Sequence, residues 1–140
     1  MRPVAFFGLA LLAVGCHRPP PAASEAEQLA TLGREVGFAL PPGTRLYGVD
    51  REGGEGMVRF KVTIPRAAWA SLEPRLPIRR SEMNRSRRGV PPDERYWDPG
   101  RYPALIARGV WQPEKQVSLL IAVDDSGPDV VTLFVFQHGT

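Results

Sequence analysis

Two apolar runs near the carboxyl end constrain the fold of this chain more than any other feature. Residues 117–123 and 130–136 are rich in Val, Ile, Leu and Phe, the side chains that favour β-strands. The segment between them, residues 124–129, reads DDSGPD, a composition typical of a turn. Two such runs joined by one short turn predict an antiparallel hairpin. The chain is therefore expected to fold around a β-sheet.

A second hairpin is predicted earlier in the chain. Residues 45–50 lead through a glycine-rich connection at 52–56 into the strand 57–64. In that strand apolar and polar side chains alternate, which is typical of a strand with one face buried and the other in solvent. The polar members, which we expect to face water, are Arg59, Lys61 and Thr63.

Two helices are predicted. Ser24 stands three residues before a glutamate, the spacing of a capping box, and apolar residues then recur at helical intervals through residues 25–36. Gly37 follows and is suited to end that helix. The second helix is short, because Pro65 can open it and Pro74 closes it.

The order of these elements predicts an α+β fold, with an antiparallel sheet of four to five strands (two hairpins) and two helices packed on one face. Residues 104–111 are interpreted as either a further strand or a helical turn. Residues 75–103 hold many prolines and arginines without a hydrophobic period, so we expect a long functional loop or a partly disordered insert. Residues 24–140 form a single domain in this prediction.

The last strand is apolar on both faces, since Phe134 and Phe136 lie on the face opposite Leu133 and Val135. Two interpretations are open. Either a helix covers the phenylalanine face, or that face is exposed and forms a binding surface.

The first sixteen residues have the pattern of an export signal. Arg2 gives a small positive start, residues 4–14 are apolar, and small residues precede Cys16, which is the only cysteine. This arrangement resembles the lipobox of bacterial lipoproteins. The resemblance implies that residues 1–15 are a signal peptide and that Cys16 carries a diacylglyceryl thioether and an amide-linked acyl chain such as palmitate. Residues 16–23 would then be a proline-rich linker.

The lipobox resemblance also implies a location and a first partner. Lipidation of Cys16 would anchor an exported protein to a membrane of the cell envelope, and two or three acyl chains make such attachment permanent. His17 rather than Asp follows, which favours the periplasmic face of the outer membrane in a Gram-negative host. Beyond this signal, the chain resembles small envelope lipoproteins of high-GC bacteria only in general character, and it shows no motif of a named family.

The principal charge feature lies in residues 75–95, where arginines outnumber acids. Guanidinium groups bind carboxylates and phosphates bidentately, so this stretch is suited to an acidic protein surface, lipid headgroups or lipopolysaccharide phosphates. Its alternative interpretation is an arginine-rich surface that is merely solvated. The candidate binding residues are Arg79, Arg80, Arg85, Arg87 and Arg88. The formal net charge of +3 is too small to demand a nucleic-acid partner.

Trp97 is the sixth candidate binding residue. It lies in the run RYWDPGRY at 95–102, whose aromatic and arginine side chains suit stacking on a sugar ring, as in peptidoglycan, or an interface. An indole beside a turn also pins a loop onto a core, and this second interpretation stays open.

No catalytic residue, metal site or cofactor is predicted. His138 is two residues from the end, where we expect the chain to fray, and His17 adjoins the lipidated cysteine. Asp124 and Asp125 fall in a predicted turn, where short acids bond to the backbone.

The acids around the glycine-rich connection do not form a calcium loop either. Asp50, Glu52 and Glu55 depart from the EF-hand pattern, since Glu55 stands where that loop requires glycine. We therefore expect a non-catalytic accessory domain that binds another envelope protein, with binding of an anionic or glycan envelope component as the alternative and an enzyme as a third.

Overall fold

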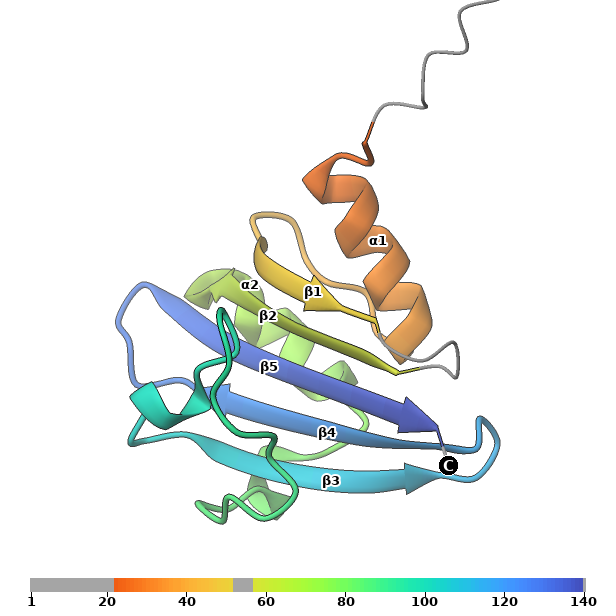
Figure 1. Cartoon of the computed structure of the whole chain (residues 1–140). Coiled ribbons are helices and arrows are strands. Elements are labelled where there is room, and N and C mark those ends of the chain that lie inside the picture. Colours follow the sequence, from red (N-terminus) through yellow and green to blue (C-terminus); the bar gives the residue numbers. More distant parts are fainter. Residues whose placement is uncertain (1–21, 52–56, 140) are drawn as a thin grey trace, which may run out of the picture.

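The structure, a computed structural model, describes residues 22–51 and 57–139 (Figure 1). Within these residues the chain forms an open antiparallel sheet of five strands and two α-helices. The elements are α1 (Glu25–Val36), β1 (Arg45–Asp50), β2 (Val58–Pro65), α2 (Arg66–Leu72), β3 (Ile106–Gln112), β4 (Val117–Asp124) and β5 (Val130–Gly139). The predicted α+β class is therefore correct.

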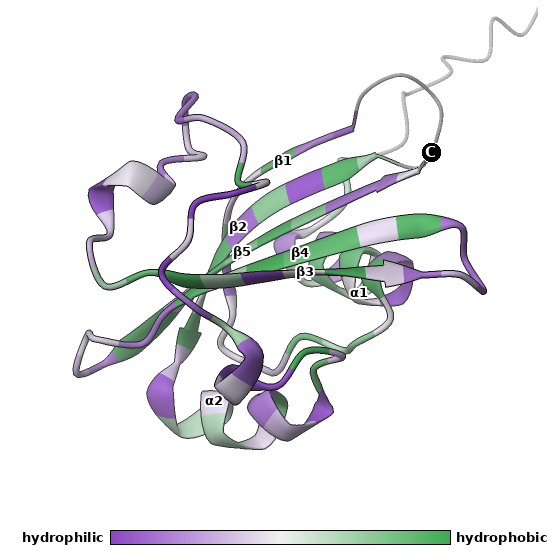
Figure 2. Cartoon of the chain, turned by 90° about the horizontal axis from the view of Figure 1, so that it is seen from below, coloured by the Kyte–Doolittle hydropathy of each residue, from purple (hydrophilic) through white to green (hydrophobic). Residues whose placement is uncertain are grey.

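Both predicted hairpins are present. β1 pairs with β2 and β4 pairs with β5, while the strand order is β1-β2-β5-β4-β3. Residues 106–112 form a strand, β3, which decides between the two interpretations of this segment. β5 lies in the middle of the sheet, and its partner β2 alternates between hydrophilic and hydrophobic residues (Figure 2).

The first helix is bounded as its sequence predicts. The Ser24 hydroxyl oxygen accepts a hydrogen bond from the amide of Glu27 at 3.2 Å. Gly37 closes the helix with φ of 89°, a left-handed conformation that glycine adopts without the strain of a side chain. Among the described residues, no helix is long and apolar enough to cross a membrane.

The core has two parts. The larger apolar cluster joins both helices to alternate residues of β2, β4 and β5, among them Leu32, Trp69, Phe60, Ile121 and Leu133. The smaller cluster includes Trp97, Leu105, Leu120, Ala122 and Phe134. Because neighbouring residues of a strand point to opposite sides, the two clusters lie on opposite faces of the sheet.

The phenylalanine face of β5 is covered, but not by a helix. Phe134 is fully buried, and its ring contacts Trp97 and Tyr102 from the connection between α2 and β3. Coverage by a helix was therefore the wrong expectation for this face. Irregular backbone can cover a sheet in this way when large aromatic side chains fill the space beneath it.

Candidate functional site

The connection between α2 and β3, residues 73–105, is ordered, and two of its segments are named separately. It contains three short 3₁₀ helices, at Glu73–Arg75, Arg80–Glu82 and Pro99–Arg101. We call residues 79–89 the arginine segment and residues 90–105 the anchor segment. An isolated bridge joins Asn84 to Ala107 at the outer edge of β3. The interpretation as a partly disordered insert does not hold for this loop.

Trp97 fastens the anchor segment to the sheet. Its side chain is completely buried, and its Nε1 donates a hydrogen bond to the carbonyl oxygen of Pro91 at 3.0 Å. The indole meets the ring of Phe134 edge to face, with centroids 5.2 Å apart. Since the ring lies in the core, it has no surface on which a sugar could stack. The structure therefore agrees with the second interpretation of Trp97, in which the indole packs the loop onto the core.

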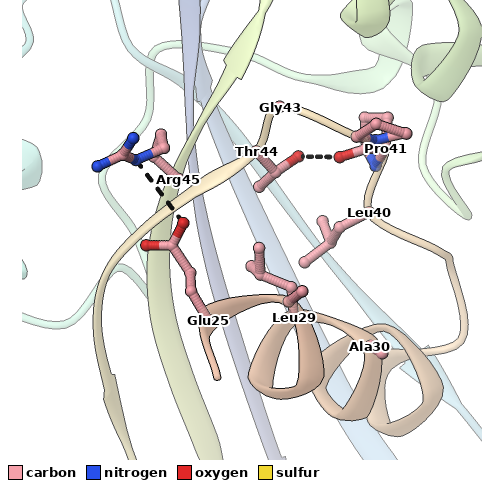
Figure 3. Close-up of a pocket in the computed structure, with 10 residues that line it drawn as sticks. Glu25, Leu29, Ala30, Leu40, Pro41, Gly43, Thr44 and Arg45 are labelled. Atoms are coloured by element: carbon pink, nitrogen blue, oxygen red, sulfur yellow. Dashed lines mark hydrogen bonds and ion pairs between the residues drawn. The ribbon is translucent and has the colours of Figure 1, made fainter. Parts of the chain in front are cut away.

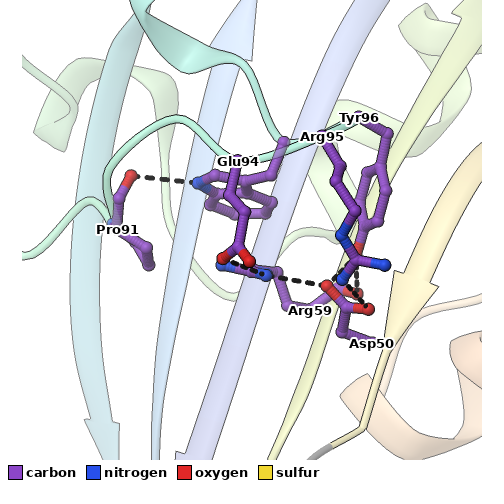
Figure 4. A network of polar contacts seen from close by, with 7 residues as sticks. Asp50, Arg59, Pro91, Glu94, Arg95 and Tyr96 are labelled. Atoms are coloured by element: carbon purple, nitrogen blue, oxygen red, sulfur yellow. Dashed lines mark hydrogen bonds and ion pairs between the residues drawn. The ribbon is translucent and has the colours of Figure 1, made fainter.

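Arg59 is buried beneath the anchor segment, contrary to the expectation that it faces water. It is only 7% exposed, and one guanidinium nitrogen donates to Asp50 Oδ2 at 2.7 Å and to Glu94 Oε2 at 3.4 Å (Figure 4). The guanidinium carbon also lies 5.4 Å from the centroid of Trp97. Covering this face with the loop removes water from the arginine, so the nearby carboxylates must compensate its charge.

Asp50 is the centre of this polar network. Besides Arg59, it accepts hydrogen bonds from Arg95 at 2.7 Å and from the hydroxyl of Tyr96 at 2.9 Å. The hydrogen bond from Arg59 lowers the pKa of Asp50 to about 2, against the opposing effect of burial. Burial, together with the neighbouring Asp50 carboxylate, raises the pKa of Tyr96 to about 12. Both groups therefore keep one protonation state near neutral pH.

Lys61 makes a second buried attachment. Its ammonium donates to Asp98 Oδ1 at 2.7 Å and lies between 5.1 and 5.5 Å from the ring centroids of Tyr47, Tyr102 and Phe134. Burial by itself lowers the pKa of Lys61, but the contacts with Asp98 and Tyr102 together outweigh it, so the net shift of this pKa is upward. The prediction that Lys61 faces water was wrong for the same reason as for Arg59: the anchor segment covers it.

A glycine in β1 allows the anchor segment to approach closely. The ring of Tyr96 lies directly against Gly48, and a β-carbon at that position would collide with it. The pairing of β1 with β2 also shifts register between Leu46 and Gly48. The polar network around Asp50 thus requires a glycine at position 48, because only a residue without a β-carbon leaves room for the ring of Tyr96.

The five arginines of the arginine segment are exposed, although Met83 within this segment is buried in the larger apolar cluster. Arg80 pairs with Asp125 at 2.7 Å, and Arg87 donates to the carbonyl oxygen of Tyr102 at 2.8 Å. Arg79, Arg85 and Arg88 are also exposed, and none of them forms an ion pair with a described residue. The structure therefore brings the five predicted arginines onto one surface segment and places Trp97 beneath its continuation.

The backbone of the arginine segment is held by its own hydrogen bonds. The amide of Ser86 donates to Asn84 Oδ1 at 2.8 Å, and the amide of Arg88 donates to Ser86 Oγ at 3.2 Å. The turn then closes with a bond from the Val90 amide to the carbonyl of Arg87, across Gly89 with φ of 83°. The guanidinium groups are thus presented from a defined turn.

One concave region lies elsewhere, beside α1. A pocket of about 510 Å³ is lined by apolar residues such as Leu29, Leu40 and Pro41, with the Glu25–Arg45 ion pair at its rim (Figure 3). Its Thr44 hydroxyl already donates to the carbonyl of Pro41 at 2.7 Å. Because its polar groups are paired with one another, this pocket offers no free group for acid–base chemistry.

The acids considered for catalysis have structural partners. Asp124 accepts hydrogen bonds from the amide and hydroxyl of Ser126, and the bond from Arg80 lowers the pKa of Asp125. His138 is paired within β5 rather than on a frayed end, and its ring stacks on Phe136. No group of three potential metal ligands occurs in residues 22–51 and 57–139. Cys16, His17, Glu52 and Glu55 lie outside the described residues.

Sequence reasoning missed the buried ionic attachments. Arg59 and Lys61 were assigned to solvent because strand alternation alone cannot show what covers the second face. The one available signal was that Glu94 and Asp98 flank Tyr96 and Trp97, which places two acids beside two aromatic residues in the same short run.

Comparisons of this chain with protein-family models, with curated proteins and with solved structures gave no significant match.

Proposed function

We propose that this chain is a non-catalytic interaction domain, anchored to a membrane of the cell envelope through a lipid on Cys16, and that its arginine segment binds an acidic surface of another envelope protein. One observation carries the proposal. Arg79, Arg85 and Arg88 are exposed without an ion-pair partner among the described residues, and Arg85 and Arg88 lie on a turn that is held by internal bonds. Preorganised charges lose little conformational entropy on binding.

The anchor segment supports the proposal by making the loop rigid. The loop is attached to the sheet at three places: Trp97 packs on the ring of Phe134, Asp98 pairs with Lys61, and Arg95 and Tyr96 donate to Asp50. The arginines are therefore displayed from a fixed position rather than from a flexible tail. Both helices belong, in this proposal, to the opposite face of the sheet, which is supported by the shared apolar cluster of Leu32 and Trp69.

The position of the arginine segment favours a protein partner over the anchoring membrane. The described chain begins next to α1, which packs beside β1 at one edge of the sheet, while Asn84 bridges to β3 at the other edge (Figure 1). Five strands spaced by about 4.8 Å separate these edges by about 19 Å. The arginines thus lie on the side away from the point where the proposed tether enters.

The test is crosslinking of the full chain in intact cells, followed by purification and identification of attached proteins and lipids. The variant changes Arg79, Arg85 and Arg88 to alanine. The matched control changes Arg34, Arg45 and Arg51 to alanine, which removes the same charge from the α1 and β1 edge. We expect one protein to be lost from the first variant and kept by the control.

The other outcomes contradict the proposal. Equal loss in both variants would show a general effect of net charge, and retention in both would show that the arginine segment is only solvated. Recovery of lipid or glycan alone would favour the anionic envelope component instead. Metabolic labelling with palmitate, compared between the wild type and Cys16→Ser, tests the anchor separately.

A further inference from the structure

Trp111 differs from the other two tryptophans of the chain in being at the surface. Its side chain is 43% exposed, whereas Trp69 and Trp97 are 5% and 0% exposed. The exposed part of this indole does not contribute to the core. Tryptophan is, however, enriched at the centres of protein interfaces. Neither the fold nor the buried network explains why an indole stands at this position.

The strand register places Trp111 on the same face of the sheet as the loop. Trp111 pairs with Ser118 of β4, which pairs with His138 of β5. Ala107 lies four residues before Trp111 in β3 and belongs to the cluster beneath the loop. Since side chains alternate along a strand, Trp111, Ser118 and His138 form a row on this face, beyond the end of that cluster.

The arginine segment borders this row. A β-carbon on Gly89 would lie 3.6 Å from Leu120, and Leu120 pairs with Gly109 of β3. Trp111 follows Gly109 by two residues on the same face, a step of about 7 Å along the strand. The exposed indole and the turn that carries Arg85, Arg87 and Arg88 are therefore neighbours on one surface.

Resting on the proposed function, we infer that Trp111 is the apolar centre of the same interface, and that the partner is a protein segment which combines acidic with apolar side chains. The arginines that have no ion pair among residues 22–51 and 57–139 supply the charge complementarity for carboxylates. The indole supplies an apolar surface that is removed from water when an apolar side chain of the partner binds it. A purely ionic ligand would not use this surface. Tryptophan beside arginine is the composition of an interface hot spot.

The test uses the full-length protein and two synthetic peptides of equal length and charge. One peptide alternates glutamate with glycine, and the other alternates glutamate with leucine. Affinities are measured by the fluorescence anisotropy of dye-labelled peptides, a readout that Trp111→Ala leaves intact. In the wild type, intrinsic fluorescence also reports on the site, because Trp111 is the one tryptophan at the surface and its emission shifts to the blue when water is removed from the ring. Anionic phospholipid vesicles are a third probe.

We expect the glutamate–leucine peptide to shift the emission and to bind at least about tenfold more tightly than the glutamate–glycine peptide. Trp111→Ala should lower the affinity for the leucine peptide about tenfold or more, while leaving the weak binding of the glycine peptide unchanged. Val130→Ala is the control, since Val130 is 42% exposed but lies at the opposite end of β5 from His138, which shares the row of Trp111. It should change neither affinity.

The outcomes separate this inference from the proposed function. The inference is overturned if both peptides bind with equal affinity, if this affinity falls in the arginine variant, and if Trp111→Ala leaves it unchanged. In that case the proposed function of the arginine segment still stands. If neither peptide binds and the alanine variant of Arg79, Arg85 and Arg88 changes nothing, both fail. A blue shift with the vesicles that exceeds the shift with the leucine peptide would overturn the choice of a protein partner.

Discussion

The arginine segment and the anchor segment belong to one connection between α2 and β3, but they meet the rest of the molecule differently. The anchor segment buries Trp97 completely and attaches Asp98 and Tyr96 to charged groups of the sheet. The arginines of the arginine segment stay exposed, and four of their five guanidinium groups have no ion pair with a described residue. Two adjacent segments of similar polarity therefore differ in role: one attaches the loop to the sheet, and the other exposes its arginines to solvent.

This contrast shows that the role of a charged side chain in a loop depends on whether it is buried and on which groups surround it. In the anchor segment, the acidic side chains pair with Arg59 and Lys61, which the loop itself removes from water. In the arginine segment, charges remain in solvent, where they cost little to keep and are available to a partner. Stability and binding should therefore be separable by mutation.

The largest effect is expected from Trp97→Ala. Removing a fully buried indole leaves a cavity between the loop and Phe134, which should lower the free energy of unfolding by about 3–5 kcal/mol. Chemical denaturation measures it, with Trp111→Ala as the control, since the exposed indole should cost about 1 kcal/mol or less. Equal losses in the two variants would contradict the burial of Trp97.

The second effect is expected from Arg59→Ala. This change leaves Asp50 without its main partner under the loop, and breaking such a covered pair should cost about 3 kcal/mol. Arg51→Ala removes an exposed pair with Glu35 and should cost between about 0 and 1 kcal/mol. Denaturation curves of the two variants that coincide would show that the covered pair is no stronger than the exposed one.

A smaller effect depends on pH. The pKa of Asp50 falls from 3.8 to about 2 in the folded protein. The folded state thus holds this proton more weakly than the unfolded state, so the stabilisation is present above about pH 4 and is lost as the pH falls towards 2. The shift corresponds to about 2 kcal/mol.

Unfolding free energies of the wild type and Asp50→Asn, measured between about pH 5 and pH 2, check this prediction. The gap between the two proteins should narrow as the solution becomes more acidic. A gap that stays constant over this range would mean that Asp50 titrates normally.

The smallest effect is expected from replacing Arg79, Arg85 and Arg88 together by alanine. Because these side chains are exposed and unpaired among the described residues, the free energy of unfolding should change by no more than about 0.5 kcal/mol. Thermal and chemical unfolding of this variant should match the wild type. A clear loss of stability would mean that the arginine segment supports the fold, and the contrast between the segments would disappear.

Local patterns in the sequence predicted the secondary structure well. The hairpin of β4 and β5, the alternation of β2 and the cap at Ser24 depend on residues close together in the chain. Such features follow from backbone preferences and short-range hydrogen bonds. The strand β3 was left open between two interpretations because it is flanked by prolines and has a weak pattern.

Local sequence patterns did not predict how the loop is attached to the sheet. Arg59 bonds to Glu94 and Lys61 bonds to Asp98, partners that are 35 and 37 residues apart in the chain. Alternation in β2 showed that its two faces differ in polarity, but it did not show that a loop would cover the polar one. The exposure of the arginines was predicted correctly because a segment without a hydrophobic period has little to bury.

By itself, the sequence determined an α+β chain with an antiparallel sheet, since the periods of strands and helices are local properties. It also located the arginine-rich stretch. Only the tertiary structure decided that Trp97 is buried while Trp111 is exposed, and that Arg59 and Lys61 lie beneath a loop. The physical reason is that burial depends on which distant segment covers a face, and covering segments are selected by packing and charge compensation over the whole molecule.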